Sequence, residues 1–155
     1  MIRLYQQNDL DDVISVFLSA IRETGSRYYS PSQVDAWARV DRDLWERRRM
    51  EKPTWIAELE GQVAGFTDLE PDGHVDMLFV HPKFGGRGVA SRLLFTAETY
   101  ARENGIDRLY TEASLAARTT FERAGFDVIE QEIVHRNGED FIRFKMQKFI
   151  MARPQ

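Results

Sequence analysis

The sequence predicts an α/β (α+β) fold with a mixed, mostly antiparallel central sheet that is flanked by helices. Three segments carry this prediction. The pattern predicts an antiparallel meander over residues 54–69. It predicts a strand, a helix, a second strand and a second helix, in that order, over residues 74–123, and a closing hairpin over residues 126–149. A meander keeps neighbouring strands antiparallel, whereas a strand–helix–strand passage places two strands parallel, so the expected sheet is mixed.

The N-terminal third is expected to be mainly helical. Residues 2–5 alternate in polarity, which predicts a short first strand. Polar residues at 8–9 can cap a helix that Gly25 ends. Ser30-Pro31 resembles a helix cap followed by proline at the first helical position. The apolar stripe of the first helix recurs at helical spacing and consists of Leu10, Val13, Ile14, Phe17, Leu18 and Ile21.

The middle of the chain alternates between turns and apolar runs. Residues 41–51 predict a further helix, and the strands at 54–60 and 63–69 flank a tight turn at Gly61-Gln62. Residues 74–80 are apolar on both faces, which predicts a central strand. The remaining expected elements are a long helix closing at Asn104-Gly105, a strand at 108–113, a helix at 116–123, and strands at 126–135 and 140–149 around the hairpin signal Asn137-Gly138.

Composition limits the possible functions. The length favours one domain over residues 1–155. The 21 basic and 25 acidic residues give a net charge of −4, which argues against nucleic acid as a partner. The chain has no cysteine, so disulfides, thiolate metal sites and a cysteine-bound acyl group are excluded, and we expect no metal. No signal-peptide pattern or membrane-length apolar run occurs, so we expect a cytoplasmic monomer or homodimer without a membrane partner.

The most informative segment is the glycine-rich stretch at residues 81–91, which joins an apolar strand to an amphipathic helix. Glycine allows backbone amides to approach a ligand closely, and the first amides of a helix have no partner inside the helix. This combination predicts an anion site that suits phosphate groups. It is not a dinucleotide fingerprint, because Ser91 stands where the third glycine belongs, and the Gly-Lys-Ser/Thr ending of a Walker loop is absent.

Two blocks of the sequence resemble a known family. The stretch Val80-x-Pro82-x-Phe84-Gly85-Gly86-Arg87-Gly88-Val89-Ala90-x-x-Leu93-Leu94 resembles the acetyl-CoA-binding motif of the GNAT N-acetyltransferase superfamily. The later stretch Ser114-x-x-Ala117-x-x-x-Phe121-Glu122-x-x-Gly125-Phe126 is similar to the next conserved block of that family, and the likeness spans about residues 54–149.

The resemblance implies an acetyl-CoA-dependent N-acetyltransferase. We expect the acetyl group to pass to a primary amine, of a small molecule, by direct attack in a ternary complex. Two alternatives stay open: an enzyme acting on a protein or peptide amine, and a non-catalytic module that binds acyl-CoA.

The same resemblance assigns roles to residues of the two blocks. The amides of Arg87, Gly88, Ala90 and Ser91 would hold the pyrophosphate of coenzyme A, Leu78 and Val80 would pair with the pantetheine arm, and the Leu78 amide would contact the thioester oxygen. The full set implied to bind the cofactor is Leu78, Phe79, Val80, Gly85, Gly86, Arg87, Gly88, Val89, Ala90, Ser91, Ser114, Ala117 and Phe121.

The chain departs from the family pattern at two positions. Gly85 stands where the family usually has arginine or glutamine, so one side-chain contact to phosphate is lost. Phe121 stands where the family often has the tyrosine that protonates the leaving thiolate. Phenylalanine donates no proton. The thiolate is therefore protonated by another group or by a water, or it leaves without an acid.

The amine needs help in losing its proton, because an alkyl ammonium has a pKa of about 10.4. Asp76 is the first candidate for the base, since an aspartate within an apolar strand is costly without a purpose. Glu112 is the second candidate and His74 the third. Tyr28 and Tyr29 lie in the loop that borders the acceptor pocket in the family, where they would bind substrate or simply pack.

Overall fold

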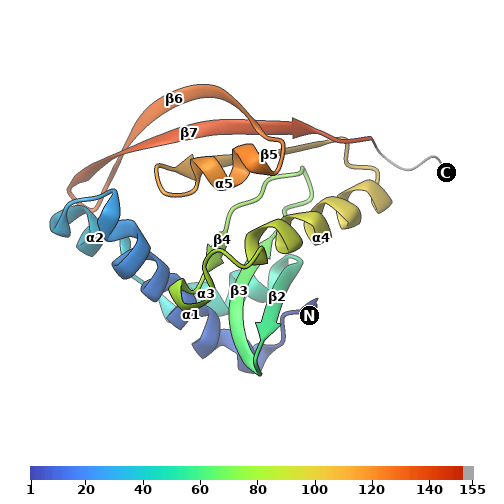
Figure 1. The fold of residues 1–155 in the computed structure, drawn as a ribbon, viewed down its shortest axis with the longest axis horizontal. Helices are drawn as coiled ribbons and strands as arrows, with labels where there is room; N and C mark the ends of the chain where they lie inside the picture. The colour runs from blue at the N-terminus through green and yellow to red at the C-terminus, as the bar shows by residue number, and fades with distance from the viewer. Residues whose placement is uncertain (152–155) are drawn as a thin grey trace.

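Residues 1–151 are described by the computed structural model, and their strands form two antiparallel sheets (Figure 1). The first sheet has the order β1 (Ile2–Leu4), β2 (Thr54–Leu59), β3 (Gln62–Asp68) and β4 (Leu78–Val80). The second sheet has the order β5 (Arg108–Ser114), β7 (Glu139–Phe149) and β6 (Asp127–Arg136). The predicted mostly antiparallel arrangement with flanking helices is confirmed.

Helices cover both faces of the first sheet. The α-helices are α1 (Leu10–Ser19), α2 (Pro31–Trp37), α3 (Arg42–Glu51), α4 (Val89–Glu103) and α5 (Arg118–Arg123). Short 3-10 segments lie at η1 (Gln7–Asp9), η3 (Gly25–Arg27) and η4 (Pro82–Phe84). Within residues 1–151, no helix is both long and apolar enough to cross a membrane.

Alternating side chains of the sheet build two cores. Ile56 and Phe66 are fully buried on the face that packs against α1, whereas Ala57 and Ala64 face α4. Gly65 lets α4 approach closely, because a Cβ there would lie 2.8 Å from the Phe79 carbonyl oxygen and 3.1 Å from the Val89 side chain. The start of α4 is therefore fixed directly against β3 and β4.

A single bridge joins the two sheets in the part of the chain that the structure describes. His74 pairs in parallel with Tyr110, the Val75 amide donates to the Tyr110 carbonyl at 2.9 Å, and the Tyr110 amide donates to Gly73 at 3.0 Å. Beyond this bridge β4 and β5 do not pair, so the two sheets separate (Figure 1).

The strand predicted at residues 74–80 is shorter than expected and is not central. Only Leu78–Val80 pairs as β4, and it forms the edge of the first sheet. The cause is Asp68, whose carboxylate Oδ1 accepts the amides of Asp76 at 2.9 Å and Met77 at 3.0 Å. These two amides are bound to a side chain instead of a strand partner, so the ladder begins later.

Two smaller expectations also need correction. The first helix does not end by a left-handed Gly25, because α1 passes into a π-helical turn (η2, Ala20–Thr24) and Gly25 keeps right-handed helical angles. The tight turn after β2 has its two positive φ angles at Glu60 and Gly61, one residue earlier than predicted. The Asn137-Gly138 hairpin is confirmed, with φ angles of 51° and 83°.

The Asp68 carboxylate is fully buried and is balanced by two cations. Arg49 Nη1 lies 3.0 Å from Asp68 Oδ2 and Lys52 Nζ lies 3.4 Å from the same oxygen. The Arg49 contact lacks hydrogen-bond alignment, so it is a buried ion pair held by charge alone. Removing one member of such a pair strands the other charge in the interior.

We therefore predict that Asp68→Ala lowers the free energy of unfolding by about 3–5 kcal/mol, because Arg49 and two amides lose their partner. Urea unfolding followed by circular dichroism measures this loss. Asp127→Ala, which changes an exposed aspartate at the start of β6, serves as the control and should change stability by about 0.5 kcal/mol or less. A similar loss in both variants would contradict the role of Asp68.

Candidate active site

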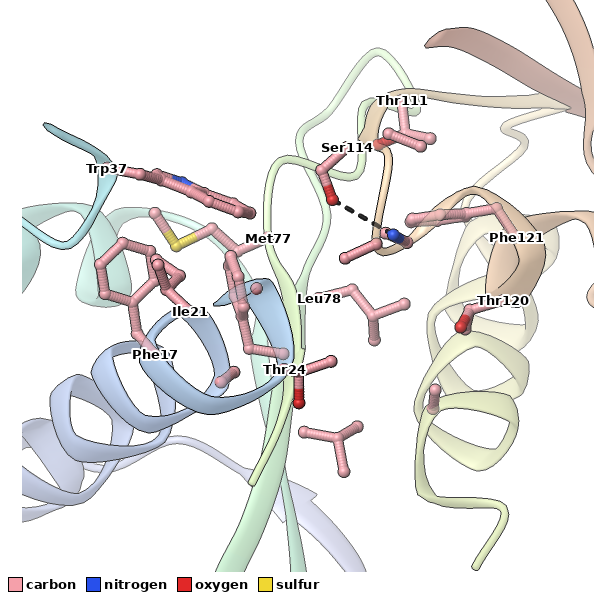
Figure 2. Close-up of a pocket in the computed structure, with 18 of the residues that line it drawn as sticks. Phe17, Ile21, Thr24, Trp37, Met77, Leu78, Thr111, Ser114, Thr120 and Phe121 are labelled. Carbon is pink, nitrogen blue, oxygen red and sulfur yellow. Dashed lines mark hydrogen bonds between the residues drawn. The ribbon is translucent and has the colours of Figure 1, made fainter. Parts of the chain in front are cut away.

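A cavity of about 880 Å³ lies where the two sheets separate. Its walls come from β4, the start of α4, β5, α5, the end of α1 and the hairpin of β6 and β7. Figure 2 shows Leu78 between two sides of this cavity, with Trp37, Phe17 and Met77 on one side and Phe121 and Thr120 on the other.

The exposed edge of β4 supplies backbone groups to the cavity. The Asp68 amide donates to the Met77 carbonyl at 3.3 Å, and the His81 amide donates to the Ala64 carbonyl at 2.8 Å. Because bonding direction alternates along an antiparallel strand, residues 77, 79 and 81 face β3 while Leu78 and Val80 direct their N–H and C=O groups away from it. Leu78 and Val80 thus offer unpaired backbone groups at the cavity wall.

The glycine-rich loop between η4 and α4 offers a second set of unpaired amides. None of the described residues accepts a hydrogen bond from the amides of residues 86–91. Gly86 and Gly88 have φ angles of 73° and 76°, and a Cβ on either would meet no heavy atom within 4 Å. The space above these amides is therefore open to a ligand at the positive end of the α4 dipole.

All of residues 85–91 were expected to bind the cofactor, but their backbone amides differ in whether they already have a hydrogen-bond acceptor. The Gly85 amide already donates to the Pro82 carbonyl at 3.1 Å, so it does not belong to the open set. The Arg87 side chain is half exposed and lies 3.1 Å from Glu60 Oε2, so it must leave that partner to reach an anion. The backbone of Val89, Ala90 and Ser91 forms the first turn of α4.

Sequence reasoning missed Arg92, which shapes the loop from the next turn of α4. Its Nη2 donates to the Arg87 carbonyl at 3.1 Å, and its Nε lies 3.4 Å from the Gly88 carbonyl oxygen. These contacts hold loop carbonyls on the helix side, which leaves the amides facing outward. An arginine four residues after a cap glycine was the available signal in the sequence.

The second sequence block forms the far wall of the cavity. Ser114 ends β5, and its Oγ accepts the Ala117 amide at 3.2 Å, as the dashed line in Figure 2 marks. Phe121 is buried and meets Phe126 edge to face at 5.1 Å. The hydroxyl-bearing Thr120, which the sequence analysis did not select, lines the cavity beside Phe121.

Glu112 and His74, two of the three candidate bases, are in direct contact. His74 Nε2 lies 2.8 Å from Glu112 Oε1, and His74 Nδ1 makes a short hydrogen bond with Glu70 Oε1. Burial alone would lower the pKa of His74, but the hydrogen bonds to the two carboxylates outweigh it and raise the pKa above its ordinary value of 6.5. Glu112 lines the cavity, while the Glu70 carboxyl is partly exposed to solvent.

Asp76 also lines the cavity, but its setting differs from the one expected. It lies before β4 and not within it, and its Oδ2 is 3.4 Å from Lys52 Nζ. Lys52 also approaches Glu70 and Asp68, so Asp76 belongs to an ion cluster at the edge of the cavity. The expected cost of an aspartate inside an apolar strand therefore does not arise, because Asp76 is exposed and faces a cation.

The two tyrosines proposed to bind substrate have different surroundings. Tyr28 is 52% exposed and does not line the cavity, so its expected contact with substrate finds no support. Tyr29 does line the cavity, but its hydroxyl accepts the Leu115 amide at 2.8 Å, and burial raises the pKa of that hydroxyl. Tyr29 therefore fastens the loop before α2 to the end of β5.

An aromatic surface on the α1 and α2 side of the cavity was not anticipated. Trp37 lies 6.2 Å from Phe79 and 6.3 Å from Phe141 between ring centroids, and Phe17 lies 5.0 Å from Phe79. Trp37 is partly buried and lines the cavity, and Trp45 also borders it although its side chain is buried in the core. Helical spacing alone does not distinguish a core face from the wall of a cavity.

Comparison with known proteins identifies the class. A family model described as Acetyltransferase (GNAT) domain matches residues 26–148. The chain is 36% identical over 146 residues to the uncharacterized N-acetyltransferase YafP of Escherichia coli, covering 94% of this chain and 93% of that protein. The chain therefore belongs to the GNAT superfamily of N-acetyltransferases and is an acyltransferase, as its two sequence blocks predicted.

Solved structures agree with this assignment. A GCN5-related N-acetyltransferase of Rhodopseudomonas palustris, also described as an aminotransferase of class II, superposes with a TM-score of 0.93 at 31% identity, covering 97% of this chain and 95% of that one. The acetyltransferase YncA of Salmonella typhimurium, solved with acetyl-CoA, has the same fold with a TM-score of 0.73 at 20% identity, covering 100% and 96% of the two chains.

The pairing of His74 with two carboxylates predicts a pH-dependent contribution to stability. A raised pKa means that charged His74 stabilises the fold fully below pH 6.5, and this stabilisation is lost as the pH rises through the raised pKa. Glu112→Gln should lower the pKa of His74, measured from its ring signal by NMR. The stability difference from the parent protein should narrow as the pH rises.

Glu130→Gln, a change at an exposed glutamate of β6, is the control and should leave the His74 titration as in the parent. A His74 that titrates below its ordinary value in the parent protein would contradict the pairing.

Proposed function

We propose that this acetyltransferase transfers the acetyl group of acetyl-CoA to the primary amine of a small molecule, within a ternary complex. The observation that carries the proposal is the set of unpaired amides at residues 86–91 beside the unpaired edge of β4. The homologous fold of the Salmonella protein, which holds acetyl-CoA as its cofactor, supports the same ligand here.

The residues of the loop fit a diphosphate. The amides of Arg87, Gly88, Ala90 and Ser91 are free donors, and the α4 dipole adds partial positive charge at the same point. A Cβ on Gly88 would point into open space, so a larger side chain there would occupy the ligand's volume. Arg87 can add a charge once it leaves Glu60.

The edge of β4 fits the arm of coenzyme A. Val80 and Leu78 offer alternate donors and acceptors to a chain of amides laid along the strand, as in strand addition. Acetyl-CoA supplies the acetyl group as an activated thioester. The Leu78 amide then stabilises the negative charge that grows on the thioester oxygen as the amine attacks.

Glu112 is our choice for the group that accepts the amine proton. It faces the cavity and contacts His74, which in turn contacts the partly exposed Glu70. Above the raised pKa of His74, where Nε2 carries no proton, a proton taken by Glu112, directly or through a water, can pass to His74 Nε2 while His74 Nδ1–H passes to Glu70 and on to solvent. Asp76 is exposed, and its carboxylate already faces Lys52 Nζ at 3.4 Å, so it is our second choice.

The leaving thiolate needs little assistance. Phe121 donates no proton, but a thiol with a pKa of about 8.5 leaves without an obligatory acid. The hydroxyls of Ser114 and Thr120 line the same wall and can bind the sulfur or a water. The chain has no cysteine to carry an acyl group, which supports direct attack.

The far end of the cavity is covered, which favours a small acceptor over a peptide. The β6–β7 hairpin lies over α2, where the Asn137 side chain donates to the Ala36 carbonyl at 2.7 Å and Gln33 Nε2 donates to the Asp140 carbonyl at 2.8 Å (Figure 1). An extended peptide needs an open groove at this point, so an acetylated protein is the less favoured acceptor.

We predict that Gly88→Trp abolishes coenzyme A binding, because the indole fills the space above the free amides. Isothermal calorimetry with coenzyme A measures the affinity. Gly105→Trp is a matched control, since Gly105 has a φ angle of 74°, a Cβ there also meets open space, and it lies at the opposite end of α4. Parent-like affinity in Gly88→Trp would refute the phosphate assignment.

We predict that Glu112→Gln lowers kcat by about a hundredfold or more, because the amide cannot accept the amine proton. Asp76→Asn is the comparison, because it removes the other cavity carboxylate at similar size. The larger loss identifies the base, and a larger loss in Asp76→Asn would overturn the choice of Glu112.

Varying both substrates should give intersecting double-reciprocal lines, whereas parallel lines would refute direct transfer.

A further inference from the structure

We infer that the acceptor is a primary alkyl amine attached to an aromatic ring, and that the ring carries an acidic group on the side away from the amine. This inference rests on the proposed function and specifies its substrate class. It is carried by two features at the acceptor end of the cavity: an aromatic wall, and two arginines that have no carboxylate partner among the described residues.

The aromatic wall is partly open to the cavity. Trp37, Met77 and Phe79 are only partly buried and line it, so they present apolar surface to a ligand. Phe17 and Phe141 are buried residues of the same wall, and edge contacts fix the ring planes: Phe17 lies 5.0 Å from Phe79 and Phe141 lies 6.3 Å from Trp37. A rigid aromatic surface of this kind favours a flat ring over a flexible aliphatic chain.

The wall lies on the side of Leu78 opposite the α5 residues. In Figure 2, Trp37, Phe17 and Met77 group together on one side of Leu78, and Phe121 lies on the other. An amine that attacks a thioester held at the Leu78 amide would therefore have its body against Trp37. The two carboxylates that line the cavity, Asp76 and Glu112, belong to the β4 and β5 region where the amine reacts.

Two exposed arginines line the cavity at the end near α2. Arg39 follows Trp37 by two residues, and Arg136 precedes Asn137, whose side chain contacts Ala36 of α2. Both arginines line the cavity, and the one side-chain contact found for either is from Arg39 Nε to the Asp35 carbonyl, at 3.4 Å. In a chain of net charge −4, two unpaired guanidinium groups beside an aromatic wall complement a carboxylate and repel a polyamine.

The test compares amines that differ in one feature. The panel contains para-(aminomethyl)benzoate, para-(aminoethyl)benzoate, the matching benzamides, phenethylamine, ε-aminocaproate and spermidine, with acetyl-CoA as donor and thiol release as readout. We expect one of the two benzoates to have the highest kcat/KM, about fivefold or more above its benzamide and above ε-aminocaproate. Preference for spermidine, ε-aminocaproate or a neutral amine over both benzoates would overturn the inference.

Variants test which residues recognise the acidic group and which recognise the ring of the acceptor. The double change Arg39→Gln and Arg136→Gln should reduce the preference for benzoate over benzamide about fivefold, through KM. Trp37→Ala should raise KM for every aromatic amine about tenfold, and Trp37→Phe should recover much of it. Arg47→Gln, on the exposed face of α3, is the control and should keep the parent preference. An unchanged preference in the double variant would exclude these arginines.

The two levels of the proposal fail in different ways. If coenzyme A binds but no amine in the panel or in a wider set releases thiol, the proposed function fails and the inference fails with it. If thiol is released with a different class of amine, the proposed function stands and only the assigned acceptor is wrong.

Discussion

The cavity between the two sheets depends on one buried carboxylate. Asp68 accepts the amides of Asp76 and Met77 through one oxygen and faces Arg49 and Lys52 with the other. The side chain takes the place of a strand partner, so β4 begins only at Leu78 and forms a short edge. A buried carboxylate is tolerated because two amides and two cations compensate for its lost hydration. Without this arrangement, we would expect the apolar run at residues 74–80 to pair with β3 over more of its length.

As a consequence, two sets of unpaired backbone amides, those of the glycine-rich loop and those of the β4 edge, line the same cavity. The end of β3 fixes the edge of β4, and Gly65 allows the start of α4 to lie against the same strand. The free amides of the loop and the free amide of Leu78 are thus held by a single rigid junction. Neither set requires a side chain, so glycine at position 85 and phenylalanine at position 121 leave the backbone features of the site intact.

Local signals in the sequence were reliable where local physics decides. Asn137-Gly138 predicted a hairpin because both residues tolerate positive φ, and the glycines at 86 and 88 predicted a loop with exposed amides for the same reason. The central strand predicted from the apolar run at 74–80 was wrong. An apolar run is typical of a central strand, but also of a segment that crosses between two sheets. Gly25 misled because a π-helical turn continues the helix past it.

By itself, the sequence determined the order of elements, the glycine-rich loop with unpaired amides and the family, since each rests on neighbouring residues or on a spacing within one block. Only the tertiary structure decided that Glu112 contacts His74 across 38 positions, that Trp37 borders a cavity, and that Tyr28 does not. The physical reason is that side-chain environment depends on which distant segments pack together. That packing is set here by the separation of the two sheets, which no local pattern encodes.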